Sequence, residues 1–333
     1  GDLGLAESYV VGDWSTPDLL ALLDFGVRNE AALGAALRGR PLARLAGRIY
    51  HLLHANTRRG SRRNIAAHYD LGNDFYAAWL DPRLIYSSAL YAPGDATLEA
   101  SQARKLARIG QLLALQPGQR VLEIGCGWGA LAVELAQTHG VNLTGITLSQ
   151  RQLEHAQAQL RKANVQHRVE LRLQDYREVQ GQFDRIVSIE MLEAVGEAYW
   201  PLYFQTLRER LKPGGQAVLQ VILIDDAQFA SYRRGADFIQ RHIFPGGLLP
   251  SDAAVRKQAT QAGFEIECTD RFGASYARTL TEWRDRFEAA WPHLQAQGFD
   301  ETFRRLWRYY LCYCEAGFRT GRVDVALYRL RLP

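Results

Sequence analysis

The segment VLEIGCGWGALAVELA, Val121–Ala136, combines an apolar run, three glycines and a helical pattern. Its first four residues predict a buried strand, and the apolar residues after Gly129 recur at helical spacing. A glycine turn between the first strand and the first helix of a doubly wound sheet lets backbone amides approach a ligand. The segment therefore predicts either a ligand-binding loop or a tight turn that binds nothing.

The chain downstream of Arg120 alternates between strand and helix patterns, which predicts an α/β fold with a doubly wound, mostly parallel sheet. The predicted strands cover residues 120–125, 142–148, 168–176, 183–190 and 216–224, with a candidate antiparallel edge strand at 264–270. Residues 225–250 and 275–333 are rich in aromatic side chains. We expect these two segments to be helical and to cover the ligand edge of the sheet.

The composition predicts a globular enzyme-sized protein with reduced cysteines. A length of 333 residues is compatible with about two domains, and 47% hydrophobic residues can form a sizeable core. No apolar run approaches the roughly 20 residues of a membrane span, and no signal peptide is expected. The four cysteines include no CxxC pair and no Cys/His spacing suited to zinc, so we predict no disulfide scaffold, no metal site and a cytoplasmic location.

Positive charge is concentrated near the N-terminus, although the net charge is only +4. No acid lies between Glu30 and Asp70, and the block Arg38–Arg63 contains eight arginines. Within it, leucines and Ile49 recur at helical spacing with arginines between them, as in an interfacial helix. The block predicts contact with an anionic membrane surface; the alternative is a solvated, arginine-rich helical face.

Two carboxylates follow the strand predicted at 183–190. In IVSIEMLEAVGE, Glu190 and Glu193 lie three residues apart with no basic residue beside them. Parallel strands direct their carboxyl ends to one edge of the sheet, where ligands bind. Taken alone, the pair suggests a general acid/base couple.

The ends of the second and third strands offer further ligand-binding candidates. Ser149 and Gln152 fit a capping box for the next helix, and the Gln152 amide could instead bind a ribose hydroxyl. Asp175 and Tyr176 are placed where they could flank an adenine. The GxGxG spacing, with Glu123 inside the strand, resembles the first motif of class I S-adenosylmethionine-dependent methyltransferases.

Four further stretches, at residues 64–91, 189–196, 238–251 and 276–287, together resemble the cyclopropane-fatty-acyl-phospholipid synthase family. The resemblance runs from about residue 60 to the end, and residues 4–14 resemble the tail of that family's N-terminal domain. It implies a helical, basic region over 1–62 and a methyltransferase domain with a seven-stranded Rossmann-like sheet over 63–333. The implied substrate is a cis-unsaturated acyl chain of a membrane phospholipid at the inner membrane face, and a homodimer is compatible with it.

The chemistry of that reaction explains why aromatic residues are expected. An isolated alkene is a weak nucleophile. The rate enhancement of methyl transfer is therefore expected to come mainly from orientation of the reactants and from a preorganised electric field. Methyl transfer leaves a carbocation, which aromatic faces can stabilise. The candidate aromatic residues are Tyr86, Trp128, Tyr276, Tyr309, Tyr310 and Tyr313. A base must then remove a proton, and in the family this base is understood to be a bound bicarbonate ion.

The resemblance also implies a role for individual residues. The cofactor-binding residues implied are Tyr86, Ser87, Glu123, Gly125, Cys126, Gly127, Gly129, Thr147, Leu148, Ser149, Gln152, Asp175, Tyr176 and Arg177. The bicarbonate-site residues implied are Cys126, Glu193, the backbone of Ile222, Tyr276, and Gln220 at the position of the family's histidine. Cys314 matches the family's active cysteine; its alternative is a packing thiol.

Two departures from the family pattern widen the range of functions. Gln220 replaces a histidine and cannot carry charge, and the usual Glu-His pair is Glu193–Ala194. In addition, Glu190 replaces a smaller residue. A methyl- or methylene-branched product, a soluble amine acceptor and a non-catalytic binder are therefore alternatives to cyclopropane formation. A nucleic-acid methyltransferase ranks last, because the chain has no stacking module or PPY-type motif.

Overall fold

The computed structural model describes residues 2–30, 32, 60, 71–95 and 97–333. Most of the block Arg38–Arg63, the interfacial helix predicted within it and the boundary expected between residues 62 and 63 lie outside the described residues. Among the described helices, none combines the length and the apolar character needed to cross a bilayer.

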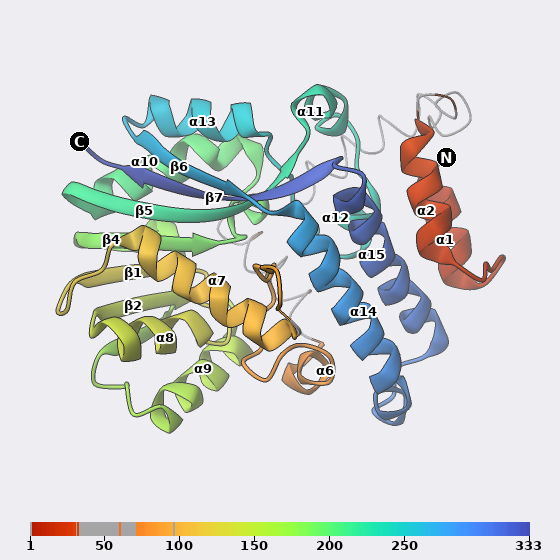
Figure 1. The fold of residues 1–333 in the computed structure, drawn as a ribbon, viewed down its shortest axis with the longest axis horizontal. Coiled ribbons are helices and arrows are strands. Elements are labelled where there is room, and N and C mark those ends of the chain that lie inside the picture. Colours follow the sequence, from red (N-terminus) through yellow and green to blue (C-terminus); the bar gives the residue numbers. More distant parts are fainter. Residues whose placement is uncertain (1, 31, 33–59, 61–70, 96) are drawn as a thin grey trace.

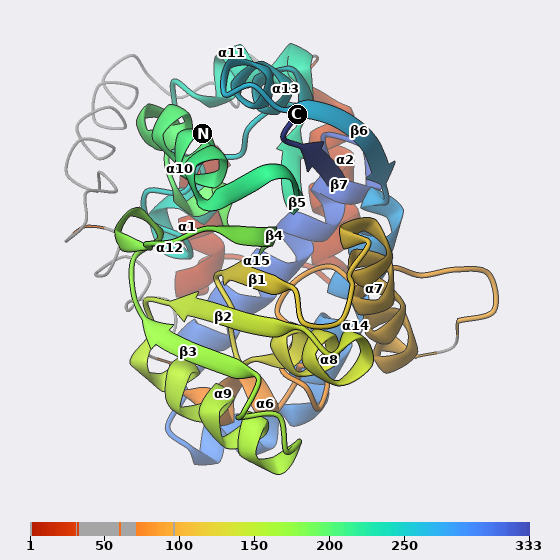
Figure 2. The same cartoon turned by 90° about the vertical axis from the view of Figure 1, so that its left-hand side faces the viewer.

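A twisted seven-stranded sheet forms the centre of the molecule, in the order β3-β2-β1-β4-β5-β7-β6 (Figure 2). The parallel strands are β1 (Arg120–Ile124), β2 (Asn142–Thr147), β3 (Val169–Leu173), β4 (Phe183–Ile189) and β5 (Leu211–Ile224). The antiparallel strands are β6 (Glu265–Arg271) and β7 (Val323–Arg331). The predicted doubly wound α/β fold and its antiparallel edge strand are thus confirmed.

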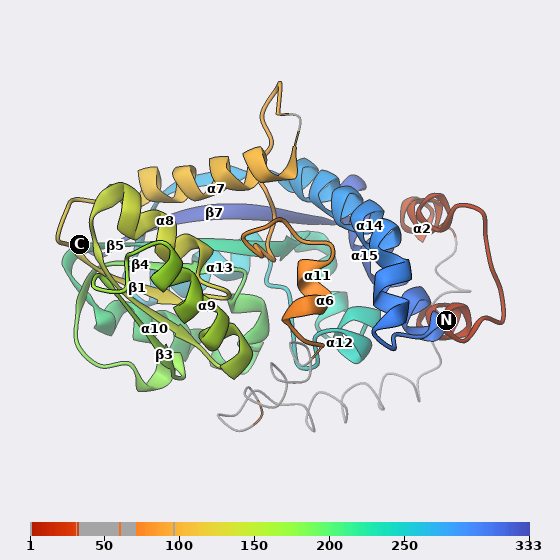
Figure 3. The same ribbon diagram turned by 90° about the horizontal axis from the view of Figure 1, so that it is seen from below.

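Alternating side chains on each strand build two cores, one on each face of the sheet. On β1, Val121 belongs to one buried cluster, whereas Leu122 and Ile124 belong to the other. The first cluster includes residues of α7 (Leu98–Leu113), α8 (Ala130–His139) and α9 (Gln150–Lys162). The second includes residues of α10 (Trp200–Arg210) and α13 (Asp252–Gln261). Figure 3 shows α7 and α10 on opposite sides of the strands.

Helices from the N-terminal, central and C-terminal parts of the chain cover the remaining edge (Figure 1). They are α1 (Asp2–Val11), α2 (Leu19–Arg28), α6 (Asn73–Ala77), α11 (Asp226–Tyr232), α12 (Phe238–His242), α14 (Gly273–Ala296) and α15 (Glu301–Arg319). Arg305 of α15 holds the N-terminal segment, because its guanidinium donates to the carbonyls of Tyr9 and Trp14 and lies 4.0 Å from the centroid of the Tyr9 ring. The helical cover predicted from the aromatic segments is therefore present.

One part of that prediction is wrong, because the end of the 275–333 segment is a strand. β7 lies between β5 and β6 and pairs with both. Its central residues, from Val325 to Tyr328, are completely buried. A short apolar run buried on both faces resembles a core helix in sequence, so pairing with β5 decides its structure.

Candidate functional site

A cavity of about 1610 Å³ opens at the carboxyl ends of the parallel strands. Ile124 of β1, Thr147 of β2, Ile189 of β4 and Ile222 of β5 line its floor. From there the cavity continues past α12 and α15 to α2. Two chemically different regions therefore share one space: the glycine loop at one end and an apolar, aromatic region at the other.

The glycine loop lies at the first end of this cavity. Gly125, Gly127 and Gly129 all have positive φ, at 84°, 51° and 90°. Gly125 and Gly127 line the cavity, and a Cβ added to Gly127 would meet no atom within 4 Å. A Cβ on Gly129 would instead lie 3.0 Å from the Cβ of Ala156, so this glycine permits close helix packing. The loop thus leaves space for a ligand beside Gly127.

The segment after β2 shows the predicted cap at Ser149, while ribose binding by Gln152 stays a prediction. Ser149 caps α9, since its Oγ accepts from the N–H of Gln152 at 3.3 Å. The Gln152 side chain accepts from the Thr147 hydroxyl at 2.9 Å. Thr147, Leu148 and Gln152 line the cavity. Ser149 therefore has a structural role here, while its three neighbours face the ligand space.

At the end of β3, Tyr176 lines the cavity while its neighbours brace it. The buried carboxylate of Asp175 pairs with Arg177 at 2.6 Å, and this guanidinium lies 5.5 Å from the centroid of the Tyr176 ring.

Glu123 is buried inside β1, and its Oε2 atom has no hydrogen-bond partner in the described structure. Burial raises the pKa of the Glu123 carboxyl well above its usual value.

Glu190 follows β4 and reaches the cavity with an unusual backbone. Its φ of 51° lies in the left-handed region, which is rare for a residue other than glycine, and its N–H donates to the Gln220 carbonyl at 2.7 Å. Its carboxylate accepts from the Ser88 N–H at 2.9 Å, from the Gln220 amide at 2.7 Å and from the Tyr276 hydroxyl at 2.7 Å. Two predicted site residues, Gln220 and Tyr276, therefore meet at Glu190, to which the family resemblance assigned no role.

A buried lysine completes the electrostatics around Glu190. Lys105 of α7 is only 1% exposed, and its ammonium donates to the Ser87 hydroxyl at 2.6 Å. Burial lowers the pKa of Lys105 to about 8, although the charges of Glu190 and Asp81 oppose the shift. Burial likewise raises the pKa of Glu190, against the hydrogen bonds to its carboxylate and the charge of Lys105. Nothing in the sequence around Lys105 distinguishes it from a surface lysine of an amphipathic helix.

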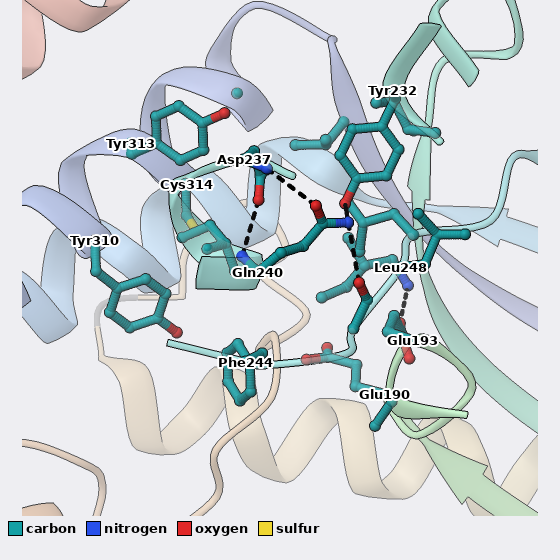
Figure 4. Close-up of a pocket in the computed structure, with 18 of the residues that line it drawn as sticks. Glu190, Glu193, Tyr232, Asp237, Gln240, Phe244, Leu248, Tyr310, Tyr313 and Cys314 are labelled. Carbon is teal, nitrogen blue, oxygen red and sulfur yellow. Dashed lines mark hydrogen bonds between the residues drawn. The ribbon is translucent and has the colours of Figure 1, made fainter. Parts of the chain in front are cut away.

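Glu193 also lines the cavity, but its partners differ (Figure 4). One carboxylate oxygen accepts from the backbone N–H of Ile222, and the other has no hydrogen-bond partner in the described structure. Burial and the charge of Glu190 raise the pKa of Glu193 to about 8. The Glu193 carbonyl accepts from the Leu248 N–H at 2.8 Å, which ties this loop to the segment after α12.

Aromatic side chains wall the cavity beyond the two acids. The hydroxyls of Tyr86 and Tyr310 lie 2.8 Å apart, and Tyr276 stacks on Phe318 with ring centroids 4.3 Å apart. The aromatic candidates that line the cavity are Tyr86, Tyr276, Tyr309, Tyr310 and Tyr313. Trp128 instead donates to the Asn73 side chain at 2.8 Å and does not contribute to the lining.

The two cysteines proposed for the site lie in different environments. Cys314 of α15 lines the cavity, and burial raises the pKa of its thiol (Figure 4). Cys126 is buried beside Gly145 of β2, outside the lining, and burial raises its pKa well above the usual value. Both thiols are therefore held in the protonated form, which is a poor nucleophile.

The short helix α12 also lines this cavity; it begins the 238–251 stretch that resembles the family, although no residue in it was predicted for the site. Asp237 and Gln240 form a reciprocal capping box at the start of α12 (Figure 4). The Gln240 amide also donates to the Tyr232 hydroxyl at 3.3 Å and to the Gly247 carbonyl at 3.0 Å. A D-x-x-Q spacing just before an apolar turn was the available sequence signal.

The comparisons with known proteins identify the family to which this architecture belongs. Residues 56–328 match the family model described as mycolic acid cyclopropane synthetase. The chain belongs to this family. It is 39% identical to the tuberculostearic acid methyltransferase UfaA1 of Mycobacterium tuberculosis and 36% identical to the cyclopropane-fatty-acyl-phospholipid synthase of Escherichia coli K12. Each alignment covers 98% of this chain, with 78% of the first relative and 82% of the second.

Solved structures of mycolic acid cyclopropane synthases share the fold. The CmaA1 enzyme complexed with SAH and CTAB superposes with a TM-score of 0.76 at 31% identity, over 81% of this chain and 98% of that one. This chain is accordingly an S-adenosylmethionine-dependent methyltransferase, in a family whose named relatives modify lipids. The resemblance found from the sequence motifs is confirmed.

The residues at the glycine end of the cavity fit S-adenosylmethionine. The open space beside Gly127 would be filled by a Cβ, and Gln152 and Tyr176 present an amide and a hydroxyl-bearing ring to the same space. The Tyr176 hydroxyl is buried without a hydrogen-bond partner in the described structure. When bound, this cofactor supplies an electrophilic methyl group on a sulfonium sulfur.

The residues expected to hold bicarbonate fit that ion poorly. The Gln220 amide and the Tyr276 hydroxyl, the two side-chain donors assigned to the ion, both hydrogen-bond the Glu190 carboxylate. The Ile222 N–H is bonded to Glu193. A bicarbonate ion would have to displace one carboxylate while lying close to another. In the described structure, each of these three donor groups is therefore already bonded to a carboxylate of the chain itself.

Proposed function

We propose that this methyltransferase transfers a methyl group to the cis double bond of an unsaturated acyl chain in a membrane phospholipid and closes a cyclopropane ring. The observation that carries the proposal is the single cavity joining the glycine loop to an apolar region. Its volume of about 1610 Å³ exceeds the roughly 300–1,000 Å³ of a typical small-molecule site. A cofactor and a long acyl chain need such room together.

The lining supports an alkene as the acceptor. An alkene has no proton for a base to remove before attack, so the protein must orient it and exclude water. Tyr86, Tyr276 and Tyr310 line the same cavity as Glu190, and aromatic faces can stabilise the carbocation that methyl transfer produces. The proton that is then lost must reach an acceptor in the same region.

The side chains at the outer end of the cavity support the proposal that the substrate enters from a membrane. Leu22 and Phe25 of α2 line this end, and they are 39% and 58% exposed. Exposed apolar side chains at a cavity mouth suit acyl-chain entry. The basic block Arg38–Arg63 would add attraction to anionic headgroups, giving peripheral association with the inner membrane face.

A methyl- or methylene-branched product is the second candidate. Glu190 and Gln220 replace the residues that the cyclopropane-forming pattern predicts, and the 39%-identical relative is named as a methyltransferase. Both products require the same methyl transfer, and they differ in the fate of the carbocation.

Expression in a bacterium that makes cis-unsaturated phospholipids but no cyclopropane fatty acids tests the proposal. Gas chromatography with mass spectrometry of the fatty acid esters should show chains longer by one carbon, and it separates ring, methyl and methylene products. The Gly127→Val variant should give none, because its side chain would enter the ligand space from a positive-φ position. Failure of the wild-type protein to add a carbon to any unsaturated chain would contradict the proposal.

A further inference from the structure

The hydrogen bonds of Glu190 are those of an anion held by neutral donors. A backbone N–H, an amide and a phenol converge on its two oxygens, and among the described residues no arginine or lysine is hydrogen-bonded to it. Lys105, the buried cation nearby, donates to Ser87 instead. A carboxylate buried for stability alone is normally paired with a cation, so this arrangement calls for another explanation.

The carboxylate is also able to receive a proton. A carboxylate has about four lone-pair sites, and the three hydrogen bonds of Glu190 leave acceptor capacity unused. Among the described residues, the Tyr276 hydroxyl is the one hydrogen-bond donor to Oε2, and Glu190 lines the cavity together with Tyr86, Gly125 and Met191. A proton released beside the glycine loop could therefore reach this oxygen without crossing bulk water.

The backbone of Glu190 strengthens this argument. A φ of 51° costs a residue with a Cβ about 1–2 kcal/mol relative to the right-handed region, a cost that glycine does not incur. Such strain is kept where the surrounding structure enforces it, and it clusters at functional sites. Here two bonds enforce it, since the Glu190 N–H and side chain both contact Gln220.

We propose that Glu190 is the base of the reaction, built into the chain in place of a bound bicarbonate. This inference rests on the proposed function. Methyl transfer forms one carbon–carbon bond, and the carbon–sulfur bond breaks with its electron pair remaining on sulfur. A C–H bond of the transferred methyl group then breaks, its electron pair closes the ring on the carbocation, and the proton passes to Glu190. Gln220 and Tyr276 act as positioning residues that hold the carboxylate.

Anion binding tests the proposal without any lipid turnover. In Glu190→Ala, the donors of Ser88, Gln220 and Tyr276 face a hole of carboxylate size. Isothermal titration of sodium bicarbonate into the protein with S-adenosylhomocysteine should show binding to Glu190→Ala and none to the wild type. Equal binding by the two, or none by the variant, would overturn the proposal. Cofactor affinity and circular dichroism, with exposed Glu154→Gln as a control, verify the fold.

Turnover on vesicles of an unsaturated anionic phospholipid provides the second arm. Wild-type turnover should be the same in CO₂-free buffer and in bicarbonate. The Glu190→Gln variant keeps the shape of the side chain, and its turnover should fall roughly 100-fold, the scale of general base catalysis. Bicarbonate should raise the turnover of the Glu190→Ala variant by about tenfold or more, which is within the range of general base catalysis. Bicarbonate dependence of the wild type, or full activity of Glu190→Gln, would overturn the inference.

The two arms separate the inference from the proposed function. A wild-type protein that modifies no unsaturated lipid would refute the proposed function. The difference in bicarbonate binding between wild type and Glu190→Ala would still decide whether Glu190 occupies an anion site.

Discussion

Two buried carboxylates in this molecule, Glu315 and Glu190, are held in opposite ways. Glu315 of α15 is completely buried, and it pairs with Arg284 of α14 and with Arg319 at 2.6 Å, while the Thr281 hydroxyl donates at 2.8 Å. In the part of the chain that the structure describes, Glu190 accepts hydrogen bonds from neutral donors alone, and it lines the cavity.

The difference separates a carboxylate that holds two helices together from one that we propose to act as the base. The charge of Glu315 is neutralised where it lies, so this residue ties α14 to α15. The charge of Glu190 is hydrogen-bonded by neutral dipoles with Lys105 nearby, and burial raises the pKa of Glu190 against both. A base needs such a raised proton affinity, whereas a structural ion pair does not.

The largest expected effect is on stability at Glu315. Glu315→Gln leaves Arg284, whose side chain is only 18% exposed, without its carboxylate. Breaking a buried pair costs about 3 kcal/mol or more. Urea denaturation should show that loss, against less than about 1 kcal/mol for Glu301→Gln, whose carboxylate is 62% exposed. An equal loss in Glu190→Gln would break the distinction between the two carboxylates.

The second-largest expected effect is a lower turnover in a variant of Tyr276. Tyr276→Phe keeps the ring stacked on Phe318 but removes the donor to Glu190. We expect turnover to fall about tenfold with KM for the lipid unchanged, the scale of one hydrogen bond to a charged group. Tyr91→Phe is the matched control, because the Tyr91 hydroxyl is buried without a hydrogen-bond partner in the described structure. A KM effect without a rate effect would point to lipid packing instead.

The smallest expected effect is a shift of the pH profile, and it tests how the charge of Lys105 acts on Glu190. The Lys105 charge lowers the pKa of Glu190, so Lys105→Met should raise it. A base must be ionised, so activity is lost as pH falls through its pKa. The acidic limb of the kcat/KM profile should therefore move to higher pH by about one unit. Lys162→Met, at the exposed end of α9, should leave the limb in place. An unmoved limb in Lys105→Met would separate Lys105 from the base.

The sequence was most informative where a pattern is local. The strands before the glycine loop and after it, and the helices between them, follow from hydrophobic periodicity. The family followed from several long motifs together. β7 could not be predicted in the same way, because its partners β5 and β6 are distant in the sequence and its apolar run also suits a buried helix.

The site was only partly predictable because its key contacts join distant segments. Glu190 meets Ser88, Gln220 and Tyr276 across separations of 102, 30 and 86 residues. No sequence motif identifies Lys105 as a site residue, because its burial depends on how α7 packs against the sheet. The departures at Glu190 and Gln220 were visible in the sequence, but only the structure shows that these two residues hydrogen-bond each other.

Isotope transfer tests the central claim most directly. The purified enzyme is given unsaturated phospholipid vesicles and S-adenosylmethionine with a trideuterated methyl group, and the acyl product is analysed by mass spectrometry. We predict that the product loses one deuterium of the methyl group, and that Glu190→Gln slows this loss without weakening cofactor binding. A product that keeps all three deuterium atoms would contradict proton removal from the transferred methyl group by Glu190.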